Sequence, residues 1–264
     1  MSSLAVTECG SPAAPAVVFL HGFMGSARDW SPVVAVLART HRCIMVDLPG
    51  HGATGAPADE SLWRPDACAG AIADILAACG GGAVVGYSLG GRIALQTAID
   101  HPGTVARAVI VSASPGIPDE AGRTARRGDD EHLACELETR GLEPFLDRWY
   151  RLPLFASLRE HPSFLAVLER RRENDPRLLA RSLRAMGTGA QRSLWDDLPG
   201  LRAPLLLLAG ERDAKFTALA LDAVALCPRG EAVVLRGRGH ALVEEDPHAV
   251  AGETAAFLDD SPKR

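Results

Sequence analysis

The segment that most constrains this chain runs from residue 83 to residue 99. A short apolar stretch leads into residues 86–90, Gly-Tyr-Ser-Leu-Gly, and a run with helical spacing follows at 93–99. A Gly-x-Ser-x-Gly pattern between a strand and a helix is typical of a strained turn that presents the serine hydroxyl at the top of a sheet. The glycines are needed because side chains there would collide across the turn. We therefore expect Ser88 to act as a nucleophile or a base, the alternative being an ordinary glycine-rich turn.

Strand-like and helix-like segments alternate on both sides of this turn. Short apolar runs predict strands, and apolar residues with a period near 3.6 predict helices. The predicted strands are 16–20, 43–47, 83–85, 105–112, 204–209 and 231–236, and the predicted helices around them are 30–37, 65–79, 93–99, 217–226 and 247–258. This alternation predicts an α/β fold, a mostly parallel central sheet flanked by helices on both faces.

The alternation is interrupted between residues 114 and 197, where little strand signal remains. Helices are predicted here at 131–150, 161–173 and 176–186, the last of which begins with a proline in its first turn. A helical block between two strands of a parallel sheet is expected to cover their carboxyl ends, where such sheets place their sites. We therefore expect a core and an inserted helical lid, with these bounds: 1–113 and 198–264 for the core, 114–197 for the lid.

The distribution of charge separates the predicted lid from the rest of the chain. The net charge of the whole chain is −5, which argues against a nucleic-acid-binding protein. Residues 121–192, however, hold 14 arginines and no lysine against 11 acidic residues, a net charge of +3. The whole chain has 26 arginines and only two lysines, so a single arginine carries little weight by itself. The local enrichment nevertheless favours a small anionic ligand.

Composition also limits where such a protein works. No apolar run approaches the roughly 18 residues of a transmembrane helix, and the first residues lack the basic and apolar segments of a secretory signal. The six cysteines are scattered without a Cys-x-x-Cys pair, which predicts reduced, mostly buried thiols rather than disulfides or a zinc site. We expect a cytoplasmic monomer or weak oligomer that neither spans a membrane nor binds nucleic acid.

A serine hydroxyl needs a partner that removes its proton, usually a histidine oriented by a carboxylate. In this setting the three residues follow one another as serine, acid and histidine. His240 is the best base, because it follows the last predicted strand on a glycine-rich loop. Asp213 is the best acid, because it follows strand 204–209, and Glu211 and Asp222 are weaker alternatives. Other histidines lie in glycine-rich loops or at the ends and faces of helices and fit less well: His21, His51, His101, His132, His161 and His248.

An oxygen that gains negative charge during a reaction needs hydrogen-bond donors aimed at it. Two backbone N–H groups are candidates. One belongs to Leu89, directly after the serine, and the other belongs to Phe23, in the loop after strand 16–20. Both lie in glycine-rich surroundings that allow a close approach of the backbone.

Arg92 lies four residues after Ser88 and therefore on the same face of the following helix. The apolar residues around it indicate that this helix is largely buried, and a buried arginine must be paired. One interpretation is a structural salt bridge. The other is a fork that receives a substrate carboxylate. Together with the arginine-rich lid, the second interpretation favours an anionic substrate.

Several motifs together resemble one family. They are Gly86-Tyr87-Ser88-Leu89-Gly90-Gly91-Arg92, Asn174-Asp175-Pro176, Met186-Gly187-Thr188-Gly189 and Gly210-Glu211-Arg212-Asp213-Ala214-Lys215-Phe216. The family they resemble is 2-succinyl-6-hydroxy-2,4-cyclohexadiene-1-carboxylate synthase, a menaquinone-pathway member of the α/β-hydrolase superfamily. The resemblance runs over nearly the whole chain, and it also rests on the lid stretches Asp147-Arg148-Trp149-Tyr150 and Phe155-Ala156-Ser157-Leu158. It is looser for the individual substrate-contacting residues of the lid.

The resemblance implies an α/β-hydrolase fold and places the residues of the site. The triad of the family falls on Ser88, Asp213 and His240, and its oxyanion donors fall on Phe23 and Leu89. Its substrate contacts fall on the following residues: Tyr87, Arg92, Arg126, Trp149 and Arg171. In the lid two registers stay open, and the alternatives are these: Arg127 in place of Arg126, and Arg170 or Arg172 in place of Arg171.

The chemistry that the resemblance implies is that of a lyase, without a metal or an organic cofactor. It eliminates pyruvate from the small polyanion 2-succinyl-5-enolpyruvyl-6-hydroxy-3-cyclohexene-1-carboxylate. Ser88, deprotonated by the His240–Asp213 pair, is expected to take the proton alpha to the ketone. Two other functions stay open at this point. One is a serine esterase or carbon–carbon bond hydrolase acting on a small anionic substrate, and the other is a non-enzymatic receptor of the same fold.

Overall fold

The structure is a computed structural model that describes residues 4–259. One sheet contains its strands in the order β1-β3-β2-β4-β5-β6-β7. They are β1 (Val6–Cys9), β2 (Ala16–Leu20), β3 (Arg42–Val46), β4 (Gly82–Tyr87), β5 (Val105–Val111), β6 (Leu205–Gly210) and β7 (Gly230–Leu235). β1 is antiparallel to β3, and every other neighbouring pair is parallel, so the predicted mostly parallel sheet is confirmed.

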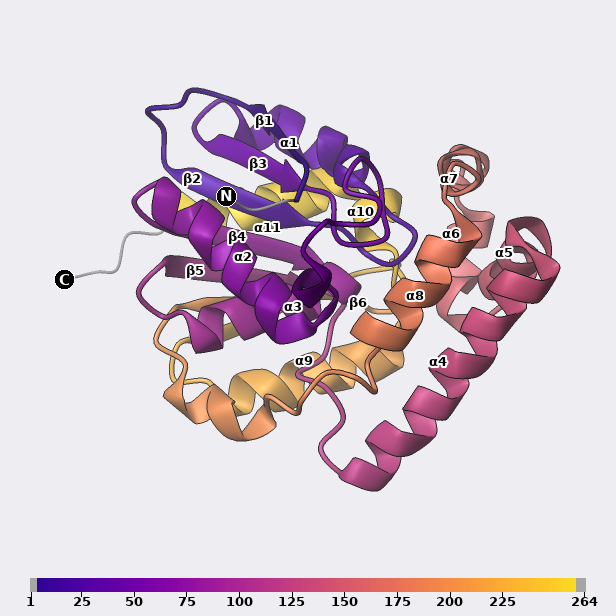
Figure 1. Cartoon of the computed structure of the whole chain (residues 1–264). Helices are drawn as coiled ribbons and strands as arrows, with labels where there is room; N and C mark the ends of the chain where they lie inside the picture. The colour runs from indigo at the N-terminus through magenta and orange to yellow at the C-terminus, as the bar shows by residue number, and fades with distance from the viewer. Residues whose placement is uncertain (1–3, 260–264) are drawn as a thin grey trace.

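Helices connect the strands and cover the sheet (Figure 1). The α-helices are α1 (Ser31–Leu37), α2 (Pro65–Ala78), α3 (Leu89–Asp100), α4 (Glu120–Arg140), α5 (Leu142–Tyr150), α6 (Ala156–Glu160), α7 (Phe164–Arg171), α8 (Pro176–Met186), α9 (Ala214–Leu226), α10 (Leu242–Glu245) and α11 (Pro247–Asp259). Short 3₁₀ turns are η1 (Ala27–Trp30), η2 (Glu60–Trp63), η3 (Pro153–Phe155) and η4 (Trp195–Gly200).

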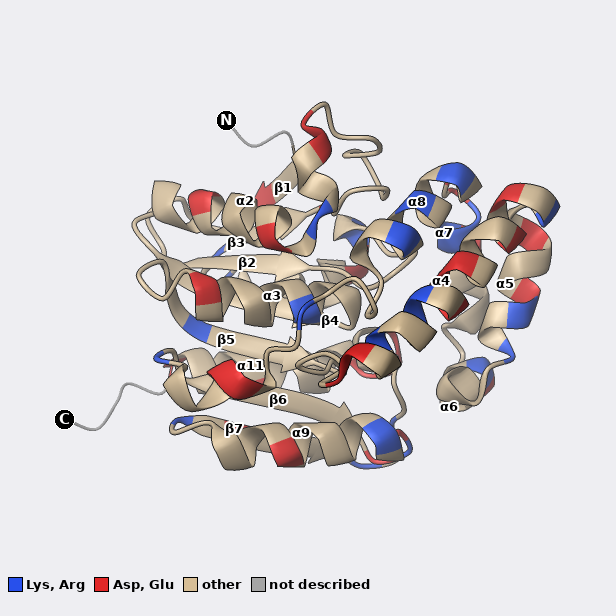
Figure 2. Ribbon diagram, turned by 60° about the horizontal axis from the view of Figure 1, so that its bottom comes forward, with Lys and Arg blue, Asp and Glu red and all other residues tan. Residues whose placement is uncertain are grey.

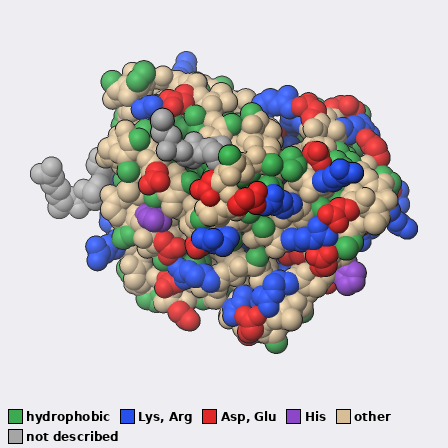
Figure 3. Space-filling model, in the orientation of Figure 1, with side chains coloured by type: hydrophobic (Ala, Val, Ile, Leu, Met, Phe, Trp, Pro, Cys, Tyr) green, Lys and Arg blue, Asp and Glu red, His purple; other side chains and the backbone are tan. Residues whose placement is uncertain are grey.

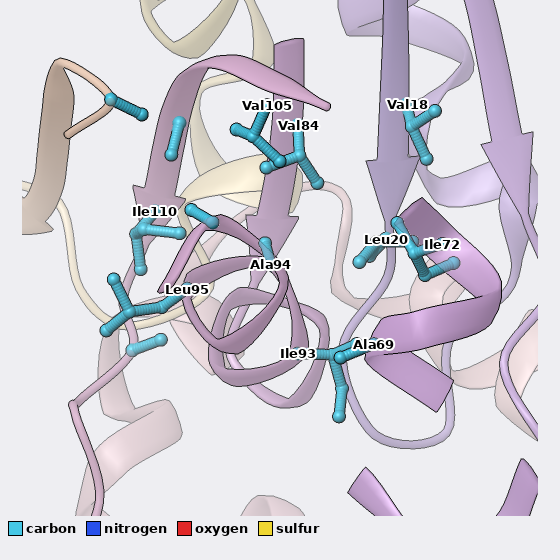
Figure 4. Close-up of a cluster of buried hydrophobic side chains, with 14 of the residues drawn as sticks. Val18, Leu20, Ala69, Ile72, Val84, Ile93, Ala94, Leu95, Val105 and Ile110 are labelled. Carbon is cyan, nitrogen blue, oxygen red and sulfur yellow. The ribbon is translucent and has the colours of Figure 1, made fainter. Parts of the chain in front are cut away.

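Alternate side chains of the strands are buried in two different apolar layers. Val18, Val84 and Ile110 belong to the layer that contains side chains of α2, α3 and α9. Figure 4 shows the part of this layer around Ile93 of α3. The intervening strand residues, such as Val85, belong to the layer that contains side chains of α1 and α11. Because both faces of the central strands are covered, strands such as β2 and β6 are buried along their whole length and apolar, which is why short apolar runs predicted them correctly.

The secondary structure differs from the prediction at several points: α4 begins at Glu120 rather than at residue 131, and the short helices α6 and α10 were not predicted. The single helix predicted at 131–150 is two helices, because Gly141 has a φ of +79° and ends α4 before α5 begins. A left-handed residue cannot continue a right-handed helix, and glycine adopts this conformation without a steric penalty. The edge strand β1 was not predicted, because three of its four residues are exposed and its pairing depends on the backbone.

Helices α4 to α8 form a layer of their own between β5 and β6, and all of this segment is described. In Figure 2 the arrow of β6 points toward the side on which these helices lie. Their shared core includes Phe145 of α5 and Leu183 of α8, together with Met24 and Ala241 from the loops that follow β2 and β7. The apolar core of this helical segment is therefore continuous with two loops at the carboxyl edge of the sheet.

The positive charge of this segment is largely neutralised within the protein. Eleven of the 14 arginines in 121–192 form ion pairs with carboxylates. Figure 3 shows blue and red side chains interspersed on the visible face. Net regional charge is therefore a weak argument for an anionic ligand here, and the argument has to come from individual arginines. Within residues 4–259, none of the helices combines the length and the apolar character needed to cross a membrane.

Candidate active site

Ser88 lies in a strained turn between β4 and α3. Its φ of 50° and ψ of −109° are unusual for a residue with a side chain, and such a conformation costs on the order of 1–3 kcal/mol. The two glycines of the motif permit the turn. A Cβ atom on Gly86 would lie 2.3 Å from the carbonyl oxygen of Gly90, and one on Gly90 would lie 2.2 Å from that of Leu20. The turn therefore has the geometry that the motif predicted, with the serine at the start of a helix.

The structure brings together the three residues predicted to form a triad. His240 Nε2 lies 3.3 Å from Ser88 Oγ, and His240 Nδ1 lies 2.7 Å from Asp213 Oδ2. Both His240 and Asp213 are buried, so their hydrogen bond is shielded from solvent. The weaker acids are elsewhere: Glu211 accepts a hydrogen bond from the N–H of Gly237, and Asp222 is exposed on α9. This arrangement can transfer a proton from the serine hydroxyl to the imidazole.

Local structure fixes both partners of the serine. Asp213 is the N-cap of α9, where its Oδ1 accepts a hydrogen bond from the N–H of Phe216 at 3.3 Å. Its other oxygen is thereby directed at His240. The imidazole packs against aromatic rings, with centroid distances of 4.5 Å to Phe216, 5.7 Å to Tyr87 and 6.1 Å to Phe155. Phe155 comes from the helical segment, so that segment is in contact with the base.

The loop that contains Phe23 is held by two buried histidines. His51 Nε2 accepts a hydrogen bond from the N–H of Met24 at 3.1 Å, and His21 Nε2 accepts one from the N–H of Leu48 at 3.0 Å. Within the described residues, the N–H groups of Phe23 and Leu89 have no acceptor. Both residues line the cavity beside Ser88. This arrangement is compatible with two donors reserved for an oxygen of a bound substrate.

Burial lowers the pKa of His51 to about 3, and the neighbouring His21 adds to this effect. The unfolded chain, in which a histidine titrates near 6.5, therefore binds more protons below that pH than the folded chain does. The free energy of unfolding should fall as the pH is lowered through this range. In His51→Gln the amide oxygen can still accept the Met24 N–H, but the side chain does not titrate. Between pH 7.5 and pH 5 we therefore expect the free energy of unfolding of this variant to fall by about 2 kcal/mol less than that of the wild type. Denaturant unfolding of both proteins at the two pH values measures this, and equal losses would contradict it.

A cavity of about 820 Å³ lies over the serine. All ten residues predicted for the site line it: Phe23, Tyr87, Ser88, Leu89, Arg92, Arg126, Trp149, Arg171, Asp213 and His240. The alternatives left open in segment 114–197 are not among the lining residues. Their guanidinium groups bond elsewhere, as follows: Arg127 to Glu120 and the Gly189 carbonyl, Arg170 to Asp29 and Glu244, and Arg172 to Glu143 and Glu169.

Arg92 is the most unusual cation of the cavity. Its side chain is 7% exposed, and its guanidinium donates to two neutral oxygens, Gln191 Oε1 at 2.8 Å and the Met186 carbonyl at 2.7 Å. No carboxylate of the described residues forms an ion pair with it. Burial and the nearby Arg126 guanidinium lower the pKa of Arg92 to about 10, so the charge is retained near pH 7. The interpretation as a structural salt bridge is therefore wrong.

The other two arginines that were predicted to contact a substrate already have acidic partners, and so does Arg212, which also lines the cavity and pairs with Glu160. Arg126 Nε bonds to Asp130 Oδ1 at 2.8 Å while its side chain stays one-third exposed. Arg171 is buried and bonds to Asp29 and Glu244 at 2.9 Å each. Its Nε, however, is buried without an acceptor among the described residues. Their roles in substrate binding stay predictions, and each would have to accommodate a ligand beside an existing ion pair.

One wall of the cavity is aromatic. Trp149 is stacked on Phe145 with ring centroids 5.5 Å apart, and it meets the ring of Phe23 edge-on at the same distance. Tyr87 lies on the serine loop, where burial raises the pKa of its hydroxyl well above the usual value and keeps it protonated. The cavity thus combines an apolar wall with a small number of cationic and polar groups, as small-molecule sites do.

Sequence reasoning missed the residues that support the site. It set His21 and His51 aside as loop residues. Each of them, however, follows a strand and is part of a His-Gly pair, and this pattern indicates a loop at the carboxyl edge of the sheet. Gln191 and the Met186 carbonyl, which hold Arg92, carried no signal of that role. Their contacts join residues almost a hundred positions apart, so no local pattern could reveal them.

Comparisons with known proteins agree with this fold. Residues 17–253 match the alpha/beta hydrolase family. The 2-succinyl-6-hydroxy-2,4-cyclohexadiene-1-carboxylate synthase of Salmonella schwarzengrund (strain CVM19633) is 34% identical over 260 residues, which are 94% of this chain and 96% of that protein. Protein PHYLLO, chloroplastic, of Arabidopsis thaliana is 35% identical over 212 residues, which are 77% of this chain but only 12% of that protein. The structure of MenH from S. aureus has a TM-score of 0.91 and 32% identity, with 98% of both chains covered. The chain therefore belongs to the 2-succinyl-6-hydroxy-2,4-cyclohexadiene-1-carboxylate synthase family, within the alpha/beta hydrolase family.

Proposed function

We propose that this protein is a lyase that eliminates pyruvate from 2-succinyl-5-enolpyruvyl-6-hydroxy-3-cyclohexene-1-carboxylate. The product is 2-succinyl-6-hydroxy-2,4-cyclohexadiene-1-carboxylate, an intermediate of menaquinone biosynthesis. Membership of the synthase family supports the reaction. The observation that carries the proposal is Arg92, a buried guanidinium that faces the cavity one helical turn after Ser88 and has only neutral partners. A polyanionic substrate supplies the negative charge that this group lacks.

The reaction begins with removal of the proton alpha to the succinyl ketone. His240, oriented by Asp213, accepts the hydroxyl proton of Ser88, and the resulting alkoxide takes the proton from the substrate carbon. The ketone becomes an enolate, whose oxygen the N–H groups of Phe23 and Leu89 can stabilise. A pair of freely donating amides next to the serine supports this assignment.

The electrons of the enolate then complete the elimination. As the ketone re-forms, they shift through the ring, create the second ring double bond and break the carbon–oxygen bond to the enolpyruvyl group. The leaving enolate takes up a proton and becomes pyruvate, so the proton removed from carbon is balanced by the one that pyruvate gains. No covalent enzyme intermediate is required. Arginines that hold the carboxylates fix the ring relative to Ser88, and such orientation lowers the barrier substantially.

The segment 114–197 is proposed to act as the lid of this site. It contributes Arg126, Trp149 and Arg171 to the lining of the cavity, and core residues contribute the triad. We also propose a cytoplasmic location. All six cysteines are free, and Cys43, Cys68 and Cys227 are buried, an arrangement typical of proteins kept in a reducing compartment.

Release of pyruvate by the purified protein tests the function. The enolpyruvyl precursor is supplied, pyruvate is measured with a coupled dehydrogenase, and the appearance of the conjugated ring diene is followed by absorbance. We expect both products to form at equal rates. Simple esters and vinylogous diketones are assayed in parallel, because faster turnover of either would show a hydrolase instead. Tight binding of the precursor without turnover would show a receptor.

A further inference from the structure

We propose that Glu245 is a positioning residue for His240, and that Ser157 of the lid acts on the base through it. The inference rests on the proposed role of His240. Gly239, which directly precedes His240, donates its N–H to Glu245 Oε2 at 2.7 Å. The other oxygen, Oε1, accepts the hydroxyl proton of Ser157 at 2.8 Å. One carboxylate thus connects α10, the loop of the base and lid helix α6.

Glu245 is held in place by these two donors. Its side chain is 5% exposed, and no arginine or lysine of the described residues forms an ion pair with it. A buried carboxylate is stable only when donors satisfy its oxygens, and bonds to a charged acceptor are about twice as strong as neutral ones. The Gly239 bond therefore restrains the backbone one residue before the imidazole.

Packing shows that the lid lies directly against this loop. A Cβ atom on Gly239 would lie 1.9 Å from Ser157 Oγ and 3.1 Å from Glu245 Oε1. Only glycine leaves room for α6 at this distance. Ser157 and Glu245 are not among the residues that line the cavity, so they are positioned to affect the base without touching a substrate.

The lid also contacts α10 at a second point, which provides a matched control. Ser163 Oγ donates to the carbonyl oxygen of Glu244 at 3.2 Å. Ser157 and Ser163 are therefore both lid serines that hydrogen-bond α10, but only Ser157 is connected to the loop of His240. A purely structural role predicts similar effects of removing either hydroxyl, whereas positioning predicts an effect on turnover from Ser157 alone.

Ser157→Ala should leave one oxygen of the buried Glu245 without a donor, so the carboxylate reorients and its bond to Gly239 weakens. His240 Nε2 then shifts from its position 3.3 Å from Ser88 Oγ. Proton transfer between Ser88 and His240 is sensitive to small changes in their separation. We therefore expect kcat for pyruvate release to fall about tenfold, while KM stays within a factor of about two of the wild-type value. For Ser163→Ala we expect kcat and KM close to those of the wild type.

Substitutions of Glu245 separate geometry from charge. In Glu245→Gln the amide can accept the Gly239 N–H and donate to Ser157 Oγ, so the geometry is kept and kcat should stay within about threefold of the wild type. Glu245→Ala removes both bonds, and we expect a loss of tenfold or more. A Gln variant as impaired as the Ala variant would contradict positioning and indicate an electrostatic role.

Hydrogen exchange of the peptide 236–246 provides a readout that does not depend on turnover. We expect faster exchange in Ser157→Ala and Glu245→Ala than in the wild type, Ser163→Ala and Glu245→Gln. If the wild type releases no pyruvate, the proposed function fails. The exchange data still decide whether the hydrogen bonds of Ser157 and Glu245 restrain the loop of His240. If the wild type is active but Ser157→Ala and Glu245→Ala keep a normal kcat, or if Ser163→Ala exchanges as fast as they do, the inference is overturned.

Discussion

Ser88→Ala is expected to lower kcat for pyruvate release by about 10³-fold, the contribution typical of a positioned general base. KM should change little, because a single hydroxyl supplies little of the binding energy of a large polyanion. His240→Ala should have the same effect, since His240 Nε2 is the group that receives the hydroxyl proton. Steady-state kinetics of both variants measure this, with circular dichroism to establish folding.

The double variant sharpens the test, because residues that act as a unit are not additive. Ser88→Ala/His240→Ala should be no slower than either single variant. A double variant slower by the product of both losses would show that the two residues act independently. Ser114→Ala is the matched control, since Ser114 lines the same cavity but its Oγ accepts a hydrogen bond from the Gly116 N–H, away from the triad.

The role of the alkoxide has its own signature. Removal of a carbon-bound proton in the rate-limiting step gives a primary isotope effect when the substrate carries deuterium alpha to the ketone. Mass spectrometry during turnover should find Ser88 unmodified. An adduct on Ser88 that forms and decays at the rate of turnover would instead show nucleophilic catalysis.

The fold and the meeting of Ser88, Asp213 and His240 in space could be predicted because their signals are local. Ser88 follows β4 directly, Asp213 follows β6 by three residues, and His240 follows β7 by five. Strands buried on both faces are apolar throughout, so their ends are visible in the sequence, and the carboxyl ends of parallel strands meet at one edge. Residues just past those ends are therefore brought together by the topology alone.

The contacts of the helical segment 114–197 could not be predicted to the same depth because they are nonlocal. Successive residues of an α-helix point about 100° apart, so a shift of one position moves a side chain from the cavity to solvent. The sequence therefore left Arg126 and Arg127 unresolved, whereas the structure places only Arg126 at the cavity. Arg171 bonds to Asp29, 142 positions away, and no pattern in either segment indicates the other.

Arg92→Ala is expected to lower kcat/KM for the enolpyruvyl substrate by about 10²-fold, because truncating one member of a buried, hydrogen-bonded charge pair costs several kcal/mol. The guanidinium lines the cavity and hydrogen-bonds to neutral acceptors only. Asp130 is near enough to interact with it electrostatically, but none of the described carboxylates forms an ion pair with it. Arg92→Lys should recover only part of the wild-type kcat/KM, since an ammonium group cannot donate the two parallel hydrogen bonds that a guanidinium donates to a carboxylate. Added guanidinium ion should partly rescue Arg92→Ala and leave the wild type unchanged.

Arg92 also has a structural role that must be separated from this effect. Its removal leaves Gln191 Oε1 and the Met186 carbonyl without their donor, so a lower melting temperature is expected as well. The value of kcat/KM is therefore calculated per folded molecule. The folded fraction is measured by active-site titration of Ser88 or by native mass spectrometry. Arg127→Ala is the control for the loss of one positive charge, because Arg127 belongs to the same helical segment as Arg126 but does not line the cavity. If folded Arg92→Ala keeps the wild-type kcat/KM, the guanidinium serves folding alone. A loss confined to Arg92→Ala, rescued by guanidinium ion, requires a substrate carboxylate at this position.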